Sequence, residues 1–308
     1  MVSLLTKCNS VACKGNLTLK RLFAAFFLLL LACGVGVAQE SPYIVTYDHH
    51  LEEPGNLEIE TYTTLGVPRS GQNFYAAPWM EIEYGVTGRW TSEFYLEGQG
   101  TAGDSAVFTG WRWENRFRPL KREHLINPVL YLEYEDTSEA SRIQKEIVGG
   151  APDVESPNSD LQPIKNHELE GKLILSGTVH DWNIAGNFIT EKNLSRGEGF
   201  EFGYAVGFSR PLATLASGTL CHFCRENFIA GIEFYGGLGS TEDGFGFRDT
   251  AQYVAPVVSW QVSENASIHF SPAVALTGQG SPMLIRVGYS YEIRGFTTRL
   301  SQWLGGKH

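Results

Sequence analysis

Two short motifs contain residue types from which redox, metal and catalytic sites are built. In the first, Cys221 and Cys224 enclose His222 and Phe223. This spacing suits a disulfide, a redox pair or, with His222, half of a metal site. No histidine directly follows Cys224, so the c-type haem pattern is absent. The other three of the five cysteines lie in the first 38 residues, which have the pattern of an export signal. We expect a disulfide between Cys221 and Cys224, because the compartment to which the chain would be exported is oxidising.

The second motif, SIHFSP, places His269 and Ser271 two residues apart. Some outer-membrane lipid deacylases carry a His-x-Ser pair on a strand, and a serine nucleophile needs an adjacent base. No third catalytic member is identifiable here, so this pair is a minor alternative. His49 and His50 are expected to be solvated. Because no phosphate loop, zinc-protease helix or paired-carboxylate motif occurs, the sequence predicts no enzyme, no cofactor and no metal.

Acidic and basic side chains recur at every second position of several segments. Alternate residues of a β-strand lie on one face. The basic residues of 112–118 should therefore meet acidic residues of the neighbouring segments 90–97 and 130–135 on that face. Arginine and carboxylate groups across two strands form strong pairs. The candidate ion-pair residues are Glu81, Glu83, Glu93, Glu97, Arg112, Glu114, Arg116, Arg118, Glu133, Glu135, Glu168, Glu170, Lys172, Arg286, Glu292 and Arg294.

The elements that carry these residues have the period-two pattern of β-strands from residue 56 onwards. In MEIEYGV, for example, Met80, Ile82 and Tyr84 alternate with Glu81 and Glu83, and a Thr-Gly-Arg turn follows. Similar alternation recurs up to residue 296. We count about twelve strands, of which the first, at 56–64, is the weakest. The predicted fold class is all-β and antiparallel.

Two folds suit such strands. A soluble β-sandwich packs its apolar faces inwards, whereas an outer-membrane β-barrel turns its apolar face to lipid and its polar face to the lumen. The barrel is favoured by strands of roughly 9–11 residues and by an even strand count. With the N-terminus in the periplasm, several periplasmic turns are tight and the opposite loop at 136–165 is long, as in such barrels. We predict a transmembrane β-barrel of about twelve strands, with the sandwich as its rival.

Several aromatic residues fall near the periplasmic ends of the predicted strands, on the apolar face. In membrane barrels such rings form a girdle at the level of the lipid headgroups. The girdle candidates are Tyr84, Trp90, Trp113, Trp182, Trp260 and Tyr291.

The N-terminus has the order of a secretory signal peptide. Four basic residues accompany an apolar run at 22–38, and Gly36 and Ala38 stand at the −3 and −1 positions of a cut before Gln39. An uncleaved anchor helix, a lipoprotein cut before Cys33 and a start downstream of the first methionine are alternatives. We divide the chain into a signal peptide (1–38), an N-terminal periplasmic segment (39–55), the barrel (56–296) and a polar C-terminal tail (297–308).

Charge and hydropathy exclude several classes of protein. Removal of residues 1–38 takes four of the 24 basic residues and none of the 34 acidic ones, and so leaves a net charge of −14. Such an acidic chain is not expected to bind nucleic acid. No run of about 18 apolar residues follows position 38, which excludes a helical multi-span protein. The expected partners are the outer-membrane bilayer, the barrel-assembly machinery and a small-molecule solute.

One hairpin resembles a known group of proteins. Residues 80–98, MEIEYGVTGRWTSEFYLEG, are similar to strand–turn–strand pairs of Gram-negative outer-membrane barrels described as transporters, including the phenol meta-pathway type. In that group a hairpin containing Glu-Tyr-Gly, Thr and Arg-Trp recurs on the periplasmic side, and here it runs from Glu83 to Trp90. The barrel also ends near an aromatic residue, Phe296, but departs from the group by adding the tail. The resemblance implies a location and an architecture more firmly than a substrate.

The sequence thus predicts an outer-membrane barrel for passive or facilitated passage of small solutes, hydrophobic ones among them. One alternative is a structural or surface-interaction barrel whose lumen is plugged by ion pairs. A less favoured alternative is a membrane lipid hydrolase that uses Ser271 and His269.

Overall fold

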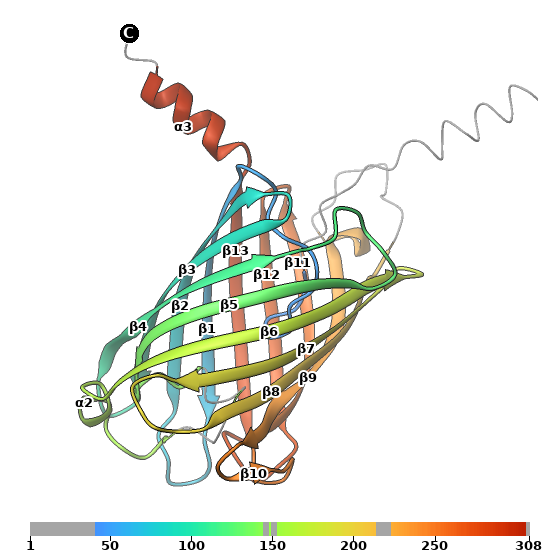
Figure 1. Cartoon of the computed structure of the whole chain (residues 1–308). Coiled ribbons are helices and arrows are strands. Elements are labelled where there is room, and N and C mark those ends of the chain that lie inside the picture. Colours follow the sequence, from blue (N-terminus) through green and yellow to red (C-terminus); the bar gives the residue numbers. More distant parts are fainter. Residues whose placement is uncertain (1–40, 144–147, 149–152, 214–222, 306–308) are drawn as a thin grey trace, which may run out of the picture. The chain divides into compact units, whose positions relative to one another are not determined.

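The computed structural model describes residues 41–305 except 144–147, 149–152 and 214–222. The predicted signal peptide lies outside the described residues. Long antiparallel strands of the described part of the chain form a barrel (Figure 1). The strands are β1 (Leu57–Val67), β2 (Tyr75–Thr87), β3 (Trp90–Thr101), β4 (Ala106–Phe117), β5 (Asn127–Ser138), β6 (Lys165–Val179), β7 (Trp182–Asn193), β8 (Phe200–Pro211), β9 (Phe228–Ser240), β10 (Gly244–Phe245), β11 (Gln252–Ser263), β12 (Ala266–Ala275) and β13 (Met283–Ile293).

The first and last strands close the sheet. Leu57 to Val67 of β1 pair residue by residue with Ile293 to Met283 of β13. The other long strands pair in chain order, and β9 lies beside β11 because β10 only extends the hairpin at the end of β9. A closed sheet leaves no unpaired edge strand. The predicted fold class is therefore confirmed: twelve long strands form a closed antiparallel β-barrel.

The two faces of the barrel wall follow the period-two pattern of the sequence. In β5, Leu130 and Leu132 are more than half exposed, whereas Tyr131 and Glu133 are buried. The same division holds along the other long strands, with leucine, phenylalanine and tryptophan outside and glutamate and arginine inside. An apolar exterior around a charged interior is the reverse of a soluble sandwich. The rival fold is therefore wrong.

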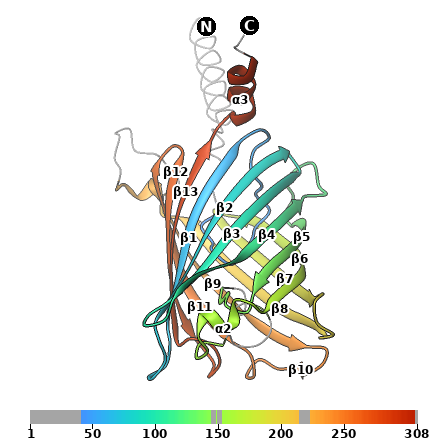
Figure 2. The same cartoon turned by 90° about the vertical axis from the view of Figure 1, so that its left-hand side faces the viewer.

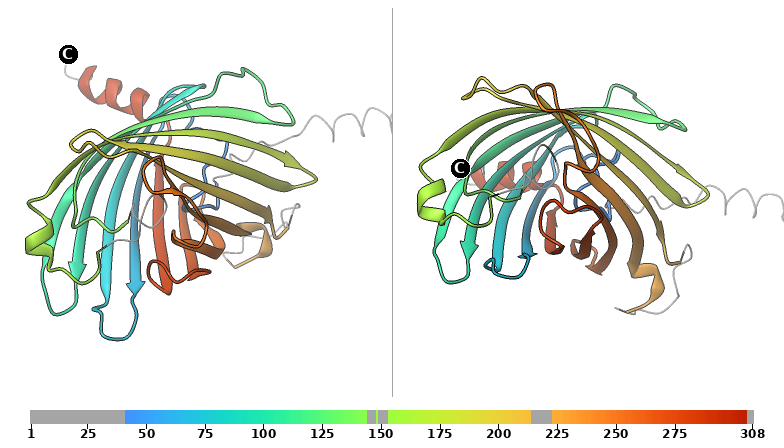
Figure 3. Two further views of the ribbon diagram at one scale, coloured as in Figure 1. Left: turned by 60° about the horizontal axis from the view of Figure 1, so that its bottom comes forward. Right: turned by 90° about the horizontal axis from the view of Figure 1, so that it is seen from below.

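The two rims of the barrel differ (Figures 1 and 2). At the upper rim of Figure 1, β2 and β3 are joined by two residues, as are β6 and β7. In the second of these turns His180 and Asp181 have φ angles of 50° and 64°, the signature of a type I′ hairpin turn. The lower rim carries longer loops, among them residues 139–164 with α2 (Asn158–Leu161). Figure 3 shows the barrel from this lower end.

The chain leaves the upper rim as a helix. The predicted polar tail forms α3 (Phe296–Gly305), which begins where the backbone N–H of Thr297 donates to the carbonyl oxygen of Gly55 at 3.1 Å. A short 3-10 turn, η2 (Arg225–Asn227), precedes β9. Among the described residues, none of the helices has the length and apolar character needed to cross a membrane.

Candidate functional site

Glutamates occupy one continuous row across the lumen. On nine neighbouring strands a glutamate is paired directly with the glutamate of the next strand, so that the row passes from β13 through β1 to β8. Its members are Glu292, Glu58, Glu83, Glu93, Glu114, Glu133, Glu170, Glu191 and Glu201. We call this set the glutamate row.

The row climbs from one rim to the other. Glu292 and Glu58 lie beside the strand ends at the upper rim, and Glu201 is the second residue of β8 at the lower rim. The climb follows from the tilt of strands in a closed barrel, which staggers the register around the wall. The glutamate row therefore spans the height of the barrel.

Three basic residues lie beside the middle of the row. Arg116 contacts Glu83 at 2.7 Å, Glu93 at 2.5 Å and Glu114 at 3.2 Å. All four side chains are largely buried. A guanidinium with several donors matches such a set of carboxylates.

The two other basic residues complete this network. Arg112 joins Glu97 at 2.6 Å to Glu133 at 3.0 Å, and Lys172 contacts Glu170 at 2.8 Å. The predicted pairs between neighbouring strands are present for Arg112 and Arg116, which contact Glu97, Glu133 and Glu93. The contact of Arg116 with Glu83, two strands away, and the pair of Lys172 with Glu170 on one strand were not predicted.

Several predicted residues have other contacts. Arg294 pairs with Glu292 on its own strand at 2.7 Å. Arg118 donates to the carbonyl oxygen of Gly88 at 3.0 Å, and Arg286 donates to the hydroxyl of Tyr235. Glu168 accepts a bond from Asn193 at 3.0 Å. Glu81 lies with Glu83 and Glu93, and Glu135 lies with Glu133 and Glu170.

A segment before β1 crosses the lumen. Residues 41–56, here called the strap, were predicted to lie in the periplasm as part of 39–55, and the structure places them against lumen-facing side chains instead. The carboxylate of Glu233 accepts the backbone N–H groups of Val45 at 2.9 Å and Thr46 at 2.7 Å. Asn187 accepts the N–H of Tyr47 at 2.7 Å and donates to its carbonyl oxygen at 2.8 Å. Buried backbone groups need such partners, which the barrel wall supplies.

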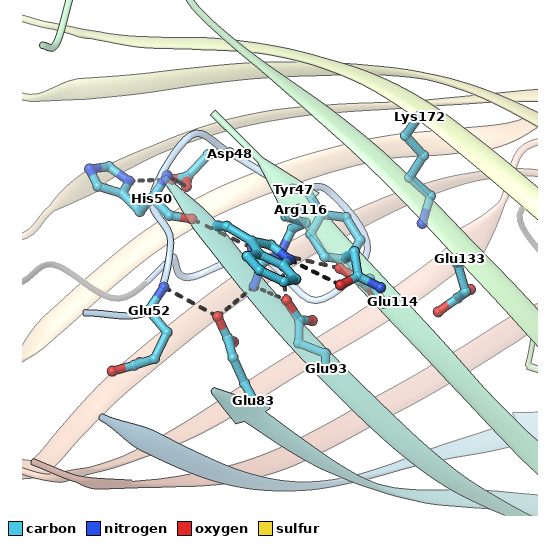
Figure 4. A network of polar contacts seen from close by, with 12 residues as sticks. Tyr47, Asp48, His50, Glu52, Glu83, Glu93, Glu114, Arg116, Glu133 and Lys172 are labelled. Atoms are coloured by element: carbon cyan, nitrogen blue, oxygen red, sulfur yellow. Dashed lines mark hydrogen bonds and ion pairs between the residues drawn. The ribbon is translucent and has the colours of Figure 1, made fainter. Parts of the chain in front are cut away.

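Tyr47 connects the strap to the ion-pair network (Figure 4). Its hydroxyl donates to Glu114 at 3.0 Å. The Lys172 ammonium lies 4.6 Å from the centre of its ring, and the Arg116 guanidinium lies 5.2 Å away. Cations over an aromatic face are attracted to it. The strap and the network therefore form one structure.

Titratable groups of the strap have shifted pKa values. Burial alone would raise the pKa of Asp48, but His50 at 3.0 Å holds it below its usual value. Burial would likewise lower the pKa of His50, and the Asp48 carboxylate raises it above its usual value. Burial, with the charge of Glu292, raises the pKa of Glu52 to about 7. His49, predicted to be solvated, is buried and bonds to Ser176 at 2.6 Å, so that prediction was wrong.

Two glycines make room for the strap. A Cβ at Gly207 of β8 would stand 2.6 Å from the ring of Tyr43, and one at Gly85 of β2 would stand 2.0 Å from the carbonyl oxygen of Glu53. Any larger side chain would therefore collide with the strap at these two positions.

The strap lies above an acidic vestibule at the lower rim. A cavity of about 390 Å³ opens among the ends of β5 to β9 and their loops. Its acidic lining residues are Glu139, Glu168, Glu191, Glu198, Glu201, Glu242 and Asp243, and Arg196 is also present. Glu191 and Glu201 are the last two members of the glutamate row and also line the vestibule, so the row continues into the vestibule.

The described residues of the two reactive motifs have contacts other than those of a catalytic pair. The Nε2 atom of His269 lies 2.7 Å from the hydroxyl of Ser267, not Ser271, and all three side chains face the lumen. Cys224 is in a disulfide. Its expected partner, Cys221, lies outside the described residues, so the pairing stays a prediction.

The girdle candidates lie on the outer face. Trp90, Trp113, Trp182 and Tyr291 are more than 40% exposed, and Tyr84 and Trp260 are partly exposed. All six lie in the halves of their strands nearer the upper rim. Their depth in a bilayer stays a prediction.

Comparisons with known proteins identify the fold. No protein-family model and no curated protein matches the sequence. Among solved structures, the COG4313 outer-membrane channel from Pseudomonas putida F1 is 10% identical, with a TM-score of 0.53 over 82% of this chain and all of that one. The KdgM porin in complex with disordered oligogalacturonate (10% identical, TM-score 0.46, 77% and 98% covered) and the NanC porin (9%, 0.47, 77% and 100%) are also similar. The chain therefore has the closed twelve-stranded β-barrel fold that is found in outer-membrane channels.

Proposed function

We propose that the chain is an outer-membrane barrel for the passage of small solutes, and that the strap limits the width of the path. The observation that carries this proposal is a charged lumen inside an apolar outer surface, crossed by a segment whose backbone at residues 45–47 is held by side chains of the barrel wall. Because the strands that close the barrel begin at Leu57, the strap can leave the lumen without breaking the sheet.

The charges of the lumen favour one class of solute. The glutamate row and the acidic vestibule would attract cations and repel anions. Neutral polar solutes of small size also suit this lining, and the resemblance of the 80–98 hairpin adds hydrophobic solutes as a class. We expect a signal peptide and the barrel-assembly machinery to deliver the chain to the outer membrane.

Liposome swelling and reversal potential test this proposal. The purified chain is inserted into liposomes and planar bilayers, and permeation is measured for neutral sugars of increasing size and for potassium chloride gradients. We expect slow entry that is restricted to the smallest sugars, and a reversal potential of the sign that shows cation preference. Anion preference would contradict the proposal.

A second candidate function is a structural or surface-interaction barrel with a permanently closed lumen. It is favoured by the same buried ion pairs of Arg112 and Arg116, which fill space beside the strap. The two candidates differ in one result. A barrel without its strap conducts if the first is correct and stays closed if the second is.

A charge on the outer face should disrupt insertion. Val287 lies midway along β13 and is 42% exposed on the outer face. Replacing Val287 by arginine is expected to destabilise the inserted barrel by about 2–4 kcal/mol, because the charge would face the lipid core. Heat-modifiable gel mobility of the outer-membrane fraction measures the effect, with Val287→Leu as the matched control. Normal assembly of Val287→Arg would show that this face does not contact lipid.

A further inference from the structure

Three carboxylates in the lumen have the arrangement of a cation site. Glu133 on β5 and Glu170 on β6 are paired directly across the two strands, and Glu135 is two residues further along β5. One oxygen atom of each lies within 4.8 Å of those of the other two. Oxygens around one Ca²⁺ ion, each at about 2.4 Å from it, lie at most about 4.8 Å apart, so the three carboxylates are close enough to share one ion. Mg²⁺ is usually held by only one or two carboxylates and keeps several waters.

The side chain of Glu135 gives independent support. It is completely buried, and neither of its carboxylate oxygens has a hydrogen-bond partner among the described residues. Buried carboxylates are normally paired with a charge, hydrogen-bonded or bound to a metal. One carboxylate oxygen of Glu135 is directed towards those of Glu133 and Glu170 and lies within 4.8 Å of each.

The charge of the surroundings fits a divalent ion. Arg112 is shared by Glu97 and Glu133, and Lys172 pairs with Glu170. With Glu135, four carboxylates therefore stand against two cationic groups, which leaves two negative charges. The other carboxylate group of the lumen, Glu81 with Glu83 and Glu93, already contacts the Arg116 guanidinium.

We propose that Glu133, Glu135 and Glu170 bind a calcium ion inside the barrel. Each would supply carboxylate oxygen, the ligand that Ca²⁺ prefers, and lumenal water would complete the six to eight ligands that it takes. The ion would connect β5 to β6 in the middle of the glutamate row and remove the uncompensated charge of Glu135. The site depends on the barrel fold alone and not on solute passage.

Terbium luminescence tests the site directly. The full chain, refolded in detergent free of lipopolysaccharide and treated with a chelator, is titrated with Tb³⁺. Tyr131, buried on β5 beside Lys172, would sensitise the emission of a nearby ion. We expect saturable emission that Ca²⁺ displaces. Glu135→Gln should weaken Tb³⁺ binding at least tenfold, because it keeps the shape of the side chain and removes its charge.

The matched control is Glu292→Gln, which makes the same change at the far end of the glutamate row and should leave Tb³⁺ affinity within twofold. Urea unfolding supplies a second measurement. Calcium should raise the unfolding midpoint of the natural chain and not that of Glu135→Gln, which should fold at least as well without calcium. Equal Tb³⁺ affinity of the natural chain and Glu135→Gln, or no response of the natural chain to either ion, would overturn the proposal. If Glu135→Gln fails to fold in chelator, the proposal is also overturned, since the carboxylate would then be needed without a metal.

Discussion

Replacing Arg116 by methionine is expected to lower the free energy of unfolding of the barrel by about 3–5 kcal/mol, the effect of removing one partner from a buried charge network. Arg116 is within 2.7 Å of Glu83 and 2.5 Å of Glu93, and it also contacts Glu114. Methionine fills a similar volume but leaves these carboxylates without their cation. The folded fraction at increasing urea, measured as the heat-modifiable band on a gel, reports the change.

The control for this substitution is Arg299→Met on the exposed helix α3, which removes the same charge where water solvates it. We expect Arg299→Met to change the free energy of unfolding by less than about 0.5 kcal/mol. Adding Glu83→Gln and Glu93→Gln to Arg116→Met should restore part of the lost stability, because the unpaired charges are then gone. Equal stability of the two arginine variants would show that the network is not stabilising as described.

Replacing Glu233 by alanine is expected to speed solute entry at least tenfold. Its buried carboxylate accepts three successive backbone N–H groups of the strap, from Ile44, Val45 and Thr46. Hydrogen bonds to charged groups contribute about 1.5–3 kcal/mol each, and a tenfold shift in the population of the displaced strap needs only about 1.4 kcal/mol. The rate of liposome swelling in a small neutral sugar measures this shift.

The graded variant is Glu233→Gln, which keeps one acceptor oxygen and loses the charge. Its rate of liposome swelling should lie between the rates of the natural chain and of Glu233→Ala. All three proteins should keep the same heat-modifiable mobility, because Glu233 contacts the strap and lies outside the ion-pair network of Arg112 and Arg116. Identical swelling rates for folded samples of the three would contradict the proposed role of the strap.

The barrel could be predicted because every strand must turn an apolar face outwards and a polar face to the lumen. The alternation of Met80, Ile82 and Tyr84 with Glu81 and Glu83 is repeated in strand after strand, and each strand carries the signal by itself. The pairing of Arg116 with Glu93 on the neighbouring strand also followed from local information, because short turns fix which strands lie side by side. The alternation of apolar and polar residues and the lengths of the turns therefore predicted the wall of the barrel and much of its ion-pair network.

The strap was missed because its structure depends on distant residues. The segment around Tyr47 has no period-two pattern, and its backbone is satisfied by Asn187 and Glu233, which lie far along the chain. The sequence did contain one signal, since Gly85 and Gly207 leave space on the lumen face, where the strap packs. The full glutamate row was missed as well, because Glu58 lies in the weakest strand and Glu191 was overlooked.

The helix α3 was missed for a different reason. Its apolar residues Leu300, Trp303 and Leu304 follow the helical spacing of three and four positions, but they stand in a short segment rich in polar residues. All three are exposed, so no packing against the barrel wall could have been anticipated from them.

The most direct test of the account is the single-channel conductance of the chain with and without residues 41–52. We expect that removing these residues leaves a folded, heat-modifiable barrel whose conductance is severalfold larger and still cation-selective, because the glutamate row stays in place. An unchanged conductance from a folded, strap-free barrel would contradict the claim that the strap limits the path through the lumen.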